Sequence, residues 1–312
     1  MARKTPIAAD LKKILSAGVR ESVALAPYAT YRIGGAADVL VEAPSELELI
    51  RALQYVHKSG ISFFILGSGS NLLIDDRGFR GVVFNLGPSL PAHIEVRRED
   101  DEHVWIRVPA WYSKAQLLAD ALDRSWAGLE FSAGIPGTLG GAVYMNAGTK
   151  WGAYADVIES VRLYHVQQGV IEKTAAEMGF RYRGHGEASL GRESIVLSVD
   201  LKLVKRAQMQ TSKDLVQEIL AYRGDKQPLE RPNCGSVFKN PENSERGAGR
   251  LIEAAGLKRH RIGGAMISDK HANFILNVDH ASSADIKSLI ALVQAEVEKQ
   301  FSIALEREVI FV

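Results

Sequence analysis

The chain has 312 residues, which is enough for two or three lobes of domain size. Hydrophobic residues make up 46% of it and charged residues 24%, an ordinary composition for a soluble globular protein. With 38 basic and 37 acidic residues, the formal net charge is +1. This balance gives no global electrostatic case for a nucleic-acid partner and leaves only a local basic patch open.

The cysteine content and the apolar runs bear on the compartment. Cys234 is the only cysteine, which excludes a disulfide within the chain and favours a reducing compartment. No apolar run reaches the length of a membrane span, and the basic start of the chain lacks the apolar core of a signal peptide. We therefore predict a cytoplasmic protein with neither a membrane nor a nucleic-acid partner. Nothing indicates a metal site or an obligate protein partner.

The first part of the chain predicts helices alternating with short strands. Apolar residues at helical spacing predict helices over residues 6–17 and 44–60, and Ser45 and Glu48 have the spacing of a capping box. A glycine pair at residues 34–35 predicts a bend between extended segments. The extended segments are expected at residues 31–33, 39–41, 63–66, 72–74 and 82–86.

The middle of the chain predicts two strand pairs, two helices and a long strand. A charged turn separates expected strands at residues 93–98 and 103–108. Ser113 is expected to cap a helix, and Thr174 with Glu177 to box a short helical turn. Alternating apolar residues over 195–203 predict a strand with one buried face. The second strand pair is expected at residues 157–166 and 170–173.

The pattern changes near Lys205, where a smaller α+β lobe is expected to begin. Thr211 starts a predicted helix, and a loop rich in proline and charge follows over residues 224–241. Further helices are expected at residues 249–255 and 283–300, and strands at residues 274–278 and 305–312.

A stretch from Gly128 to Gly148 holds six glycines, with Pro136 near its middle. So many glycines exclude an ordinary helix or strand there, because glycine weakens both. Successive main-chain N–H groups that turn to one side form a concave site for anions such as phosphate. We predict a cradle for a phosphate-bearing cofactor, and the alternative is a surface loop of tight turns.

A second loop of this kind, residues 67–71 with the sequence GSGSN, lies between two apolar segments. Its main-chain N–H groups and the hydroxyls of Ser68 and Ser70 are suitable donors for a pyrophosphate. No Gly-Lys-Ser/Thr follows, which excludes a Walker loop, and the G-x-G-x-x-G dinucleotide fingerprint is absent. The alternative is a simple hairpin turn.

Seven blocks of the sequence together resemble the UDP-N-acetylenolpyruvoylglucosamine reductases, a family of flavoenzymes of bacterial cell-wall synthesis. The blocks follow the family's order from about residue 30 to residue 309, so the resemblance covers nearly the whole chain. They are TYRIGGAAD, LGSGSNLLIDD, GIPGTLGGAVYMNAG, KQPLERPNCGSVFKNP, AGRLIEAAGLKRHRIGGAMIS, KHANFILN and LEREV.

The resemblance implies an α+β fold in two parts. Residues 1–204 would form a two-lobed FAD-binding module of the vanillyl-alcohol-oxidase/PCMH type, with lobes at about 20–86 and 87–204. Residues 205–312 would form a smaller α+β substrate-binding domain. The implied reaction uses NADPH as co-substrate and a non-covalent FAD to reduce the enolpyruvyl group of UDP-N-acetylglucosamine enolpyruvate. Its product, UDP-N-acetylmuramate, is a precursor of peptidoglycan.

Three residues match the family's catalytic positions. By the resemblance, Ser236 is the proton donor, Arg183 binds the substrate carboxylate, and Glu308 assists the enol intermediate. Hydride addition leaves negative charge on the carboxylate-bearing carbon and its oxygens, so a bidentate guanidinium and a positioned proton donor suit this chemistry. Without the resemblance, these residues would be a turn serine, a surface arginine and a solvated strand residue.

The resemblance also implies two sets of binding residues. Two members of the substrate set, Arg223 and Lys226, could instead belong to a solvated charge cluster. A third member, His271, could instead have a structural role. The FAD set is Tyr31, Arg32, Gly67, Ser68, Gly69, Ser70, Asn71, Leu72, Ala133, Gly134, Ile135, Pro136, Gly137, Gly140, Gly141 and Asn146. The substrate set is Arg223, Lys226, Asn240 and His271.

Two further expectations concern single features of the chain. Cys234 is expected to be inert packing, since nothing argues for a lowered thiol pKa. The stretch between Arg183 and the strand that starts at Ser194 is too short for the tyrosine-bearing loop of some family members. The chain therefore resembles the family's shorter variety, which leaves the residue that clamps the diphosphate open.

Two rival functions are weighed against this one. The first is a flavin oxidoreductase of the same fold that acts on an alcohol or amine; such enzymes often tether the flavin to a histidine, and neither glycine loop has one. The second is a nucleotide-binding or scaffold protein without activity. The presence of Arg183, Ser236 and Glu308 argues against this second rival.

Overall fold

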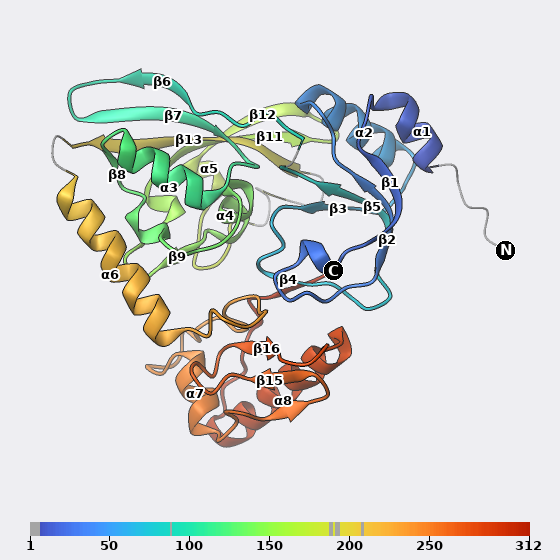
Figure 1. The fold of residues 1–312 in the computed structure, drawn as a ribbon. Coiled ribbons are helices and arrows are strands. Elements are labelled where there is room, and N and C mark those ends of the chain that lie inside the picture. The colour runs from blue at the N-terminus through green and yellow to red at the C-terminus, as the bar shows by residue number, and fades with distance from the viewer. Residues whose placement is uncertain (1–6, 88, 187–189, 191–193, 207–208) are drawn as a thin grey trace. The chain divides into compact units, whose positions relative to one another are not determined.

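The computed structural model describes residues 7–87, 89–186, 190, 194–206 and 209–312 (Figure 1). These residues form an α+β protein. The helices are α1 (Ile7–Ile14), α2 (Glu46–Lys58), α3 (Lys114–Asp123), α4 (Leu139–Met145), α5 (Ala175–Met178), α6 (Gln210–Lys226), α7 (Ala248–Ala254) and α8 (Ser283–Phe301), with 3-10 turns η1 (Ala26–Tyr28), η2 (Glu130–Ser132) and η3 (Tyr154–Asp156).

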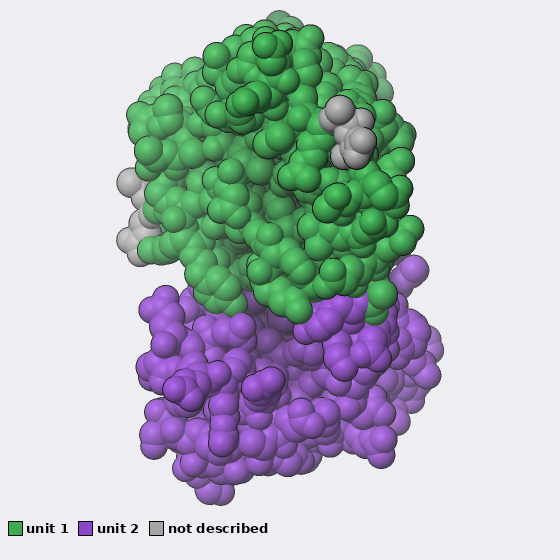
Figure 2. All heavy atoms as spheres, turned by 90° about the vertical axis from the view of Figure 1, so that its left-hand side faces the viewer, with its two compact units in different colours: residues 1–21, 39–67, 81–221 green, residues 22–38, 68–80, 222–312 purple. Residues whose placement is uncertain are grey.

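The chain divides into two compact units, which Figure 2 shows in separate colours. Neither unit is one continuous segment, because the chain passes from one to the other several times. Unit 1 comprises residues 1–21, 39–67 and 81–221, and unit 2 comprises residues 22–38, 68–80 and 222–312.

The largest sheet belongs to unit 1 and has the strand order β12-β11-β13-β7-β6, with β8 pairing β13 (Figure 1). Its pairings are antiparallel, and they include both predicted strand pairs. The strands are β6 (Glu95–Glu99), β7 (His103–Pro109), β8 (Trp126–Ala127), β11 (Ile158–His165), β12 (Gly169–Thr174) and β13 (Ser194–Lys205).

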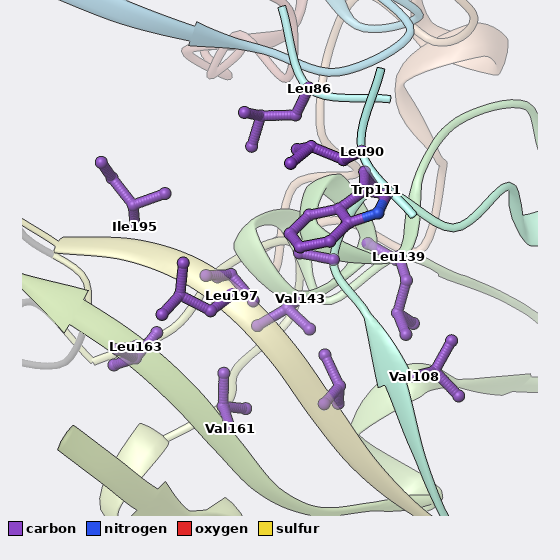
Figure 3. Close-up of a cluster of buried hydrophobic side chains, with 14 of the residues drawn as sticks. Leu86, Leu90, Val108, Trp111, Leu139, Val143, Val161, Leu163, Ile195 and Leu197 are labelled. Atoms are coloured by element: carbon purple, nitrogen blue, oxygen red, sulfur yellow. The ribbon is translucent and has the colours of Figure 1, made fainter. Parts of the chain in front are cut away.

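Strand β13 differs from the prediction of a single buried face. Residues 195–199 are all buried, and alternation begins only at Leu201. The strand lies in the middle of the sheet, and helix α4 packs against it. Figure 3 shows Val143 of α4 close to Leu197 of β13 and Val161 of β11, within the hydrophobic core of unit 1.

A second sheet has the strand order β1-β2-β5-β3, and β3 pairs with β5 in parallel. Small two-stranded sheets accompany it: β9 pairs with β10, and β4 pairs with β17. The strands are β1 (Val19–Ala24), β2 (Ala36–Val41), β3 (Phe63–Leu66), β4 (Leu72–Leu73), β5 (Phe79–Asn85), β9 (Gly148–Thr149), β10 (Gly152–Ala153) and β17 (Ile310–Phe311).

Two predicted helix caps form differently from the expectation. The Ser45 hydroxyl accepts a hydrogen bond from Glu48 N at 3.2 Å, as predicted. The Glu48 carboxylate, however, accepts from Ser16 N at 2.8 Å and not from Ser45 N, so the capping box does not form. Ser113 does lie at the N-cap of α3, although its hydroxyl makes no capping bond. The box of Thr174 and Glu177 is confirmed.

The second half of the glycine-rich stretch is a helix, which corrects the prediction that this stretch excludes one. Helix α4 contains Gly140 and Gly141, and its first residue follows the N-cap Thr138. Glycine costs about 1 kcal/mol per helical position relative to alanine. Burial of Leu139 and Val143 in the core offsets this cost, since each buried aliphatic side chain contributes about 1.5–3 kcal/mol.

Unit 2 contains a three-stranded sheet, β14-β15-β16, together with α7 and α8. The hairpin of β14 (Arg261–Ile262) and β15 (Ala265–Ile267) was not predicted, because its strands are too short to show a hydrophobic period. Strand β16 (Ile275–Asn277) was predicted, whereas β17 covers only two residues of the strand expected at 305–312. Helix α6 continues to Lys226, past the expected start of the loop at residue 224.

Residues 31–33 are not a strand, although an extended segment was expected there. Arg32 has a φ of +58°, and its N–H donates to Ala29 O at 2.9 Å, so this segment turns.

Among the described residues, no helix combines the length and the apolar character needed to cross a membrane.

The start of helix α8 is capped by a carboxylate that is distant in the sequence. Asp76 accepts hydrogen bonds from Ser283 N at 2.9 Å and from the Ser283 hydroxyl at 2.8 Å. A negative charge at a helix N-terminus also interacts favourably with the helix dipole. Asp76 therefore ties the loop before β5 to the principal helix of unit 2.

We predict that Asp76→Ala lowers the free energy of unfolding by about 1–2 kcal/mol, the typical cost of a lost N-cap. Asp76→Asn keeps an acceptor for Ser283 N and should lose less than half as much. Urea unfolding followed by circular dichroism measures both variants. Equal stability of wild type and Asp76→Ala would contradict the role of this cap.

Candidate functional site

The loop at residues 67–71 is not a hairpin turn. It leaves β3, which pairs with β5, and enters β4, which pairs with β17, so the two flanking strands do not pair with each other. Gly69 has a φ of +62°, and an added Cβ would overlap the carbonyl oxygen of Tyr28. The Gly69 carbonyl accepts a hydrogen bond from Thr30 N at 3.2 Å. The loop thus packs closely against the preceding backbone, at a position where only glycine fits.

Three main-chain N–H groups of this loop, those of Ser68, Gly69 and Asn71, find no acceptor among the described residues. The side chain and carbonyl of Asn71, by contrast, are both bonded. Asn71 Nδ2 donates to Glu308 O at 3.0 Å, and Asn71 O accepts from Ile310 N at 3.0 Å. Unit 2 therefore brings a predicted cofactor residue, Asn71, against a predicted catalytic residue, Glu308.

The glycine-rich stretch of unit 1 forms a turn that leads into α4. Gly134 and Gly137 have φ values of +71° and +128°, which favour glycine. Their N–H groups, and that of Thr138, find no acceptor among the described residues. Gly140 N, in contrast, donates to Ala110 O at 2.7 Å. Within this stretch, main-chain N–H groups without acceptors are therefore found at residues 134, 137 and 138, a shorter segment than predicted.

Gly67, the one residue of the first loop that belongs to unit 1, lies beside the second glycine-rich stretch. A Cβ added to Gly67 would lie 2.7 Å from the Thr138 hydroxyl oxygen, closer than such contacts occur. Within unit 1, the structure thus places a predicted cofactor residue, Gly67, next to the turn that ends at Thr138.

Arg183 lies at the tip of a tight reverse turn in unit 1. The turn is closed by Arg181 N, which donates to Gly184 O at 3.0 Å, and by Gly184 N, which donates to Arg181 O at 3.1 Å. Arg183 has a φ of +53°, a conformation that costs a residue with a Cβ about 1–2 kcal/mol. Its guanidinium carbon lies 5.0 Å from the centroid of the Tyr182 ring, and its Nε is buried. This is not the free surface arginine of the alternative interpretation.

Ser236 begins a short segment that is bonded on both sides within unit 2. On one side, Val237 N donates to Asn273 O at 2.9 Å. On the other, Glu308 N donates to Val237 O at 2.8 Å. The backbones of the predicted proton donor and of the predicted catalytic carboxyl residue are therefore held on neighbouring segments.

Asn273 holds the segment next to Ser236, and the sequence analysis did not single it out. Its side chain is 4% exposed and bonds both polar groups of one backbone unit. Asn273 Oδ1 accepts from Phe238 N at 3.0 Å, and Nδ2 donates to Phe238 O at 2.8 Å. The Asn273 amide thus makes the two backbone hydrogen bonds that a neighbouring strand would make at Phe238, two residues after Ser236. Its place in the block KHANFILN was the one available signal.

The predicted substrate residues all belong to unit 2 and have different surroundings. Burial lowers the pKa of Arg223, and its Nε finds no hydrogen-bond partner among the described residues. Lys226 pairs with Asp225 at 2.7 Å on the surface. Asn240 Oδ1 accepts from Ala248 N at 3.0 Å and so caps α7.

His271 supports the residue that holds the Ser236 segment. Its Nδ1 accepts a hydrogen bond from Asn273 N at 3.2 Å, and its ring packs against Phe274. Burial lowers the pKa of His271, so the imidazole is neutral at pH 7. These contacts favour the structural role that was left open for this histidine.

Tyr31 and Cys234 lie in the hydrophobic core of unit 2. Tyr31 is fully buried, its carbonyl accepts from Asn277 Nδ2 at 2.9 Å, and Arg32 beside it is exposed. Burial raises the pKa of the Cys234 thiol to about 12. The thiol is therefore protonated at neutral pH, which confirms the expected inert packing.

Family models match both parts of this arrangement. Residues 37–175 match the FAD binding domain, and residues 227–312 match the C-terminal domain of UDP-N-acetylenolpyruvoylglucosamine reductase. The first match covers the glycine-rich stretch and the loop at residues 67–71, and the second covers Ser236, Asn273 and Glu308. The fold and site thus define a flavoprotein with an FAD-binding domain.

Known proteins match nearly the whole chain. The UDP-N-acetylenolpyruvoylglucosamine reductase of Bacillus licheniformis is 39% identical over 308 residues, which cover 96% of each chain. That of Moorella thermoacetica is 39% identical and covers 98% of this chain and 97% of its own. The crystal structure of the reductase from Thermus caldophilus superimposes with a TM-score of 0.75 at 34% identity, over 94% of this chain and 99% of its own.

The chain belongs to the UDP-N-acetylenolpyruvoylglucosamine reductase family. The predicted resemblance, the α+β class with its FAD-binding module, and FAD as cofactor are thereby confirmed. The expected absence of the tyrosine loop concerns residues 184–193, of which 187–189 and 191–193 lie outside the described residues.

We predict that Gly69→Ala lowers the amount of FAD that co-purifies with the protein, because the new methyl group displaces the loop from Tyr28. Gly60→Ala is a matched control, since Gly60 has the same φ of +62° but nothing within 4 Å of its added Cβ. The control should cost about 1 kcal/mol of stability and keep its flavin. The ratio of flavin to protein absorbance measures both. Equal flavin content in the two variants would contradict the role of Gly69.

Proposed function

We propose that this protein is an FAD-containing, NADPH-dependent reductase of UDP-N-acetylglucosamine enolpyruvate that forms UDP-N-acetylmuramate for peptidoglycan. The observation that carries the proposal is family membership over nearly the full length of both chains. In the balanced reaction, hydride from NADPH and one proton add across the enolpyruvyl double bond, and NADP⁺ is released. We place this reaction in the cytoplasm.

The donors present in the two glycine loops fit FAD. Main-chain N–H groups without acceptors suit phosphate oxygens in each loop taken by itself, at residues 68, 69 and 71 in the first and at residues 134, 137 and 138 in the second. The Cβ position of Gly69 is filled by the backbone of Tyr28, so this position admits only glycine, and a Cβ at Gly67 would press on the Thr138 hydroxyl. When bound, FAD supplies the two-electron relay between NADPH and the enolpyruvyl group. We propose that residues 1–204 form the FAD-binding module and residues 205–312 the substrate-binding domain.

We propose that Arg183 binds the substrate carboxylate. A guanidinium can donate two parallel hydrogen bonds to it, and these bonds strengthen as negative charge grows on the carboxylate-bearing carbon. The turn at residues 181–184 supports this role, because a left-handed arginine is costly and such strain is concentrated at functional sites.

We propose that Ser236 donates the proton that completes the addition and that Glu308 assists it. A serine hydroxyl is a weak acid, so its position must compensate for its low acidity. The hydrogen bonds from Asn273 and Glu308 to the segment that follows Ser236 support a fixed position for this hydroxyl. We further propose that Arg223 and Lys226 attract the diphosphate and that Asn240 contacts the substrate. For His271, the contacts with Asn273 and Phe274 favour a structural role over the predicted substrate contact.

We predict that Ser236→Ala leaves the reduction of the bound flavin by NADPH within about twofold of wild type. Reoxidation by the enolpyruvyl sugar should slow by about 10²-fold or more, because a positioned general acid typically contributes that much. Anaerobic stopped-flow absorbance at the flavin band separates the two half-reactions. Equal slowing of both would exclude the role of proton donor.

We predict that Arg183→Lys slows the reaction with the sugar by about 10- to 100-fold. An ammonium cannot reproduce the bidentate fork, and one hydrogen bond to a charged group contributes about 1.5–3 kcal/mol. The measurement is steady-state kinetics with varied sugar at fixed NADPH. Arg183→Ala should be slower still. Wild-type kinetics for the lysine variant would refute bidentate binding of the substrate carboxylate by Arg183.

A further inference from the structure

Asn146 occupies a position from which it reaches the turn that carries Arg183. It ends helix α4 with a φ of +40°, a conformation that asparagine tolerates better than most residues. Its side chain is 7% exposed, so its amide is almost closed off from water. Asn146 Nδ2 donates to Arg181 O at 3.0 Å, and Asn146 Oδ1 accepts from Ala155 N at 3.0 Å. Both ends of the amide therefore bind the protein's own backbone.

The bond to Arg181 reaches the carbonyl that closes the arginine turn. That oxygen accepts from Gly184 N at 3.1 Å and from Asn146 Nδ2 at 3.0 Å. The left-handed conformation of Arg183 costs about 1–2 kcal/mol, and contacts around the turn must offset this cost. The second donor links this turn to a helix whose residues Leu139 and Val143 are buried in the core of unit 1.

We propose that Asn146 is a positioning residue for Arg183: it holds the turn at residues 181–184 so that the guanidinium stays in place for the substrate carboxylate. The inference rests on the proposed function of Arg183. It assigns the side chain of Asn146 to the sugar half-reaction, whereas the resemblance had placed this residue among the FAD ligands.

The two assignments predict different defects. If Asn146 positions Arg183, its loss leaves flavin binding and flavin reduction by NADPH unchanged and slows only the step that needs the carboxylate held. If Asn146 is chiefly an FAD ligand, its loss releases flavin or changes the reaction with NADPH. A purely structural role would lower stability without separating the two half-reactions.

Two variants remove the bond in different ways. Asn146→Gly keeps the left-handed backbone and loses both amide bonds. Asn146→Asp keeps the acceptor for Ala155 N but places a carboxylate oxygen against Arg181 O. The control Arg162→Ala removes a paired arginine of the same unit, bound to Glu46 at 2.7 and 2.9 Å, and leaves the turn intact.

The test is anaerobic stopped-flow spectroscopy of full-length protein, with NADPH and the enolpyruvyl sugar supplied separately. Both Asn146 variants should keep their flavin and react with NADPH within about twofold of wild type. Their reoxidation by the sugar should be at least tenfold slower, with a raised KM for the sugar and an unchanged KM for NADPH. Arg162→Ala should react with the sugar as wild type does, even if its melting temperature falls.

A double variant tests the coupling directly. Asn146→Asp combined with Arg183→Lys should be no more than about twofold slower than Arg183→Lys alone, because residues that act as a unit are not additive. Additive losses, loss of flavin, or equal slowing of both half-reactions would overturn the inference while leaving the proposed function standing. Wild-type protein that the sugar does not reoxidise would overturn the proposed function and this inference together.

Discussion

Hydrogen bonds from asparagine side chains to the backbone hold the segments on which the candidate site depends. The predicted catalytic residues Ser236, Arg183 and Glu308 all lie outside the regular strands and helices, where no extended ladder of backbone bonds fixes the chain. Buried backbone groups in such segments still need partners. A short amide side chain supplies both a donor and an acceptor, and it is rigid enough to set a position.

The same device recurs at each of these segments, within each unit taken by itself. Asn71 binds the carbonyl of Glu308, Asn146 binds that of Arg181, and Asn273 brackets Phe238. In every case the amide joins an irregular segment to residues of the core or to the first glycine loop. The backbones of the predicted catalytic residues are thereby held by neighbouring side chains, and their own side chains stay available for the substrate.

Glycine has the complementary role in the two loops. At Gly67 and Gly69 a side chain would meet Thr138 and the backbone of Tyr28, so the chain can approach itself closely only without one. This close packing leaves several N–H groups without acceptors among the described residues, so they are available to donate hydrogen bonds to an anionic ligand.

Most of the local elements, the α+β class and the family could be predicted from the amino-acid sequence. The hairpin of β6 and β7, the box of Thr174 and Glu177, and the long helix α8 follow from short-range periodicity and caps, which depend on neighbours a few residues away. Three features became visible in the folded chain alone: the bond from Asn146 to Arg181, the bond between Asn71 and Glu308, 237 residues apart, and the helix that contains Gly140. The two bonds join residues far apart in the chain, so no local pattern of hydrophobicity or turn residues encodes them. The helix forms against the propensity of its glycines because Leu139 and Val143 are buried in the core, and that burial also depends on distant residues.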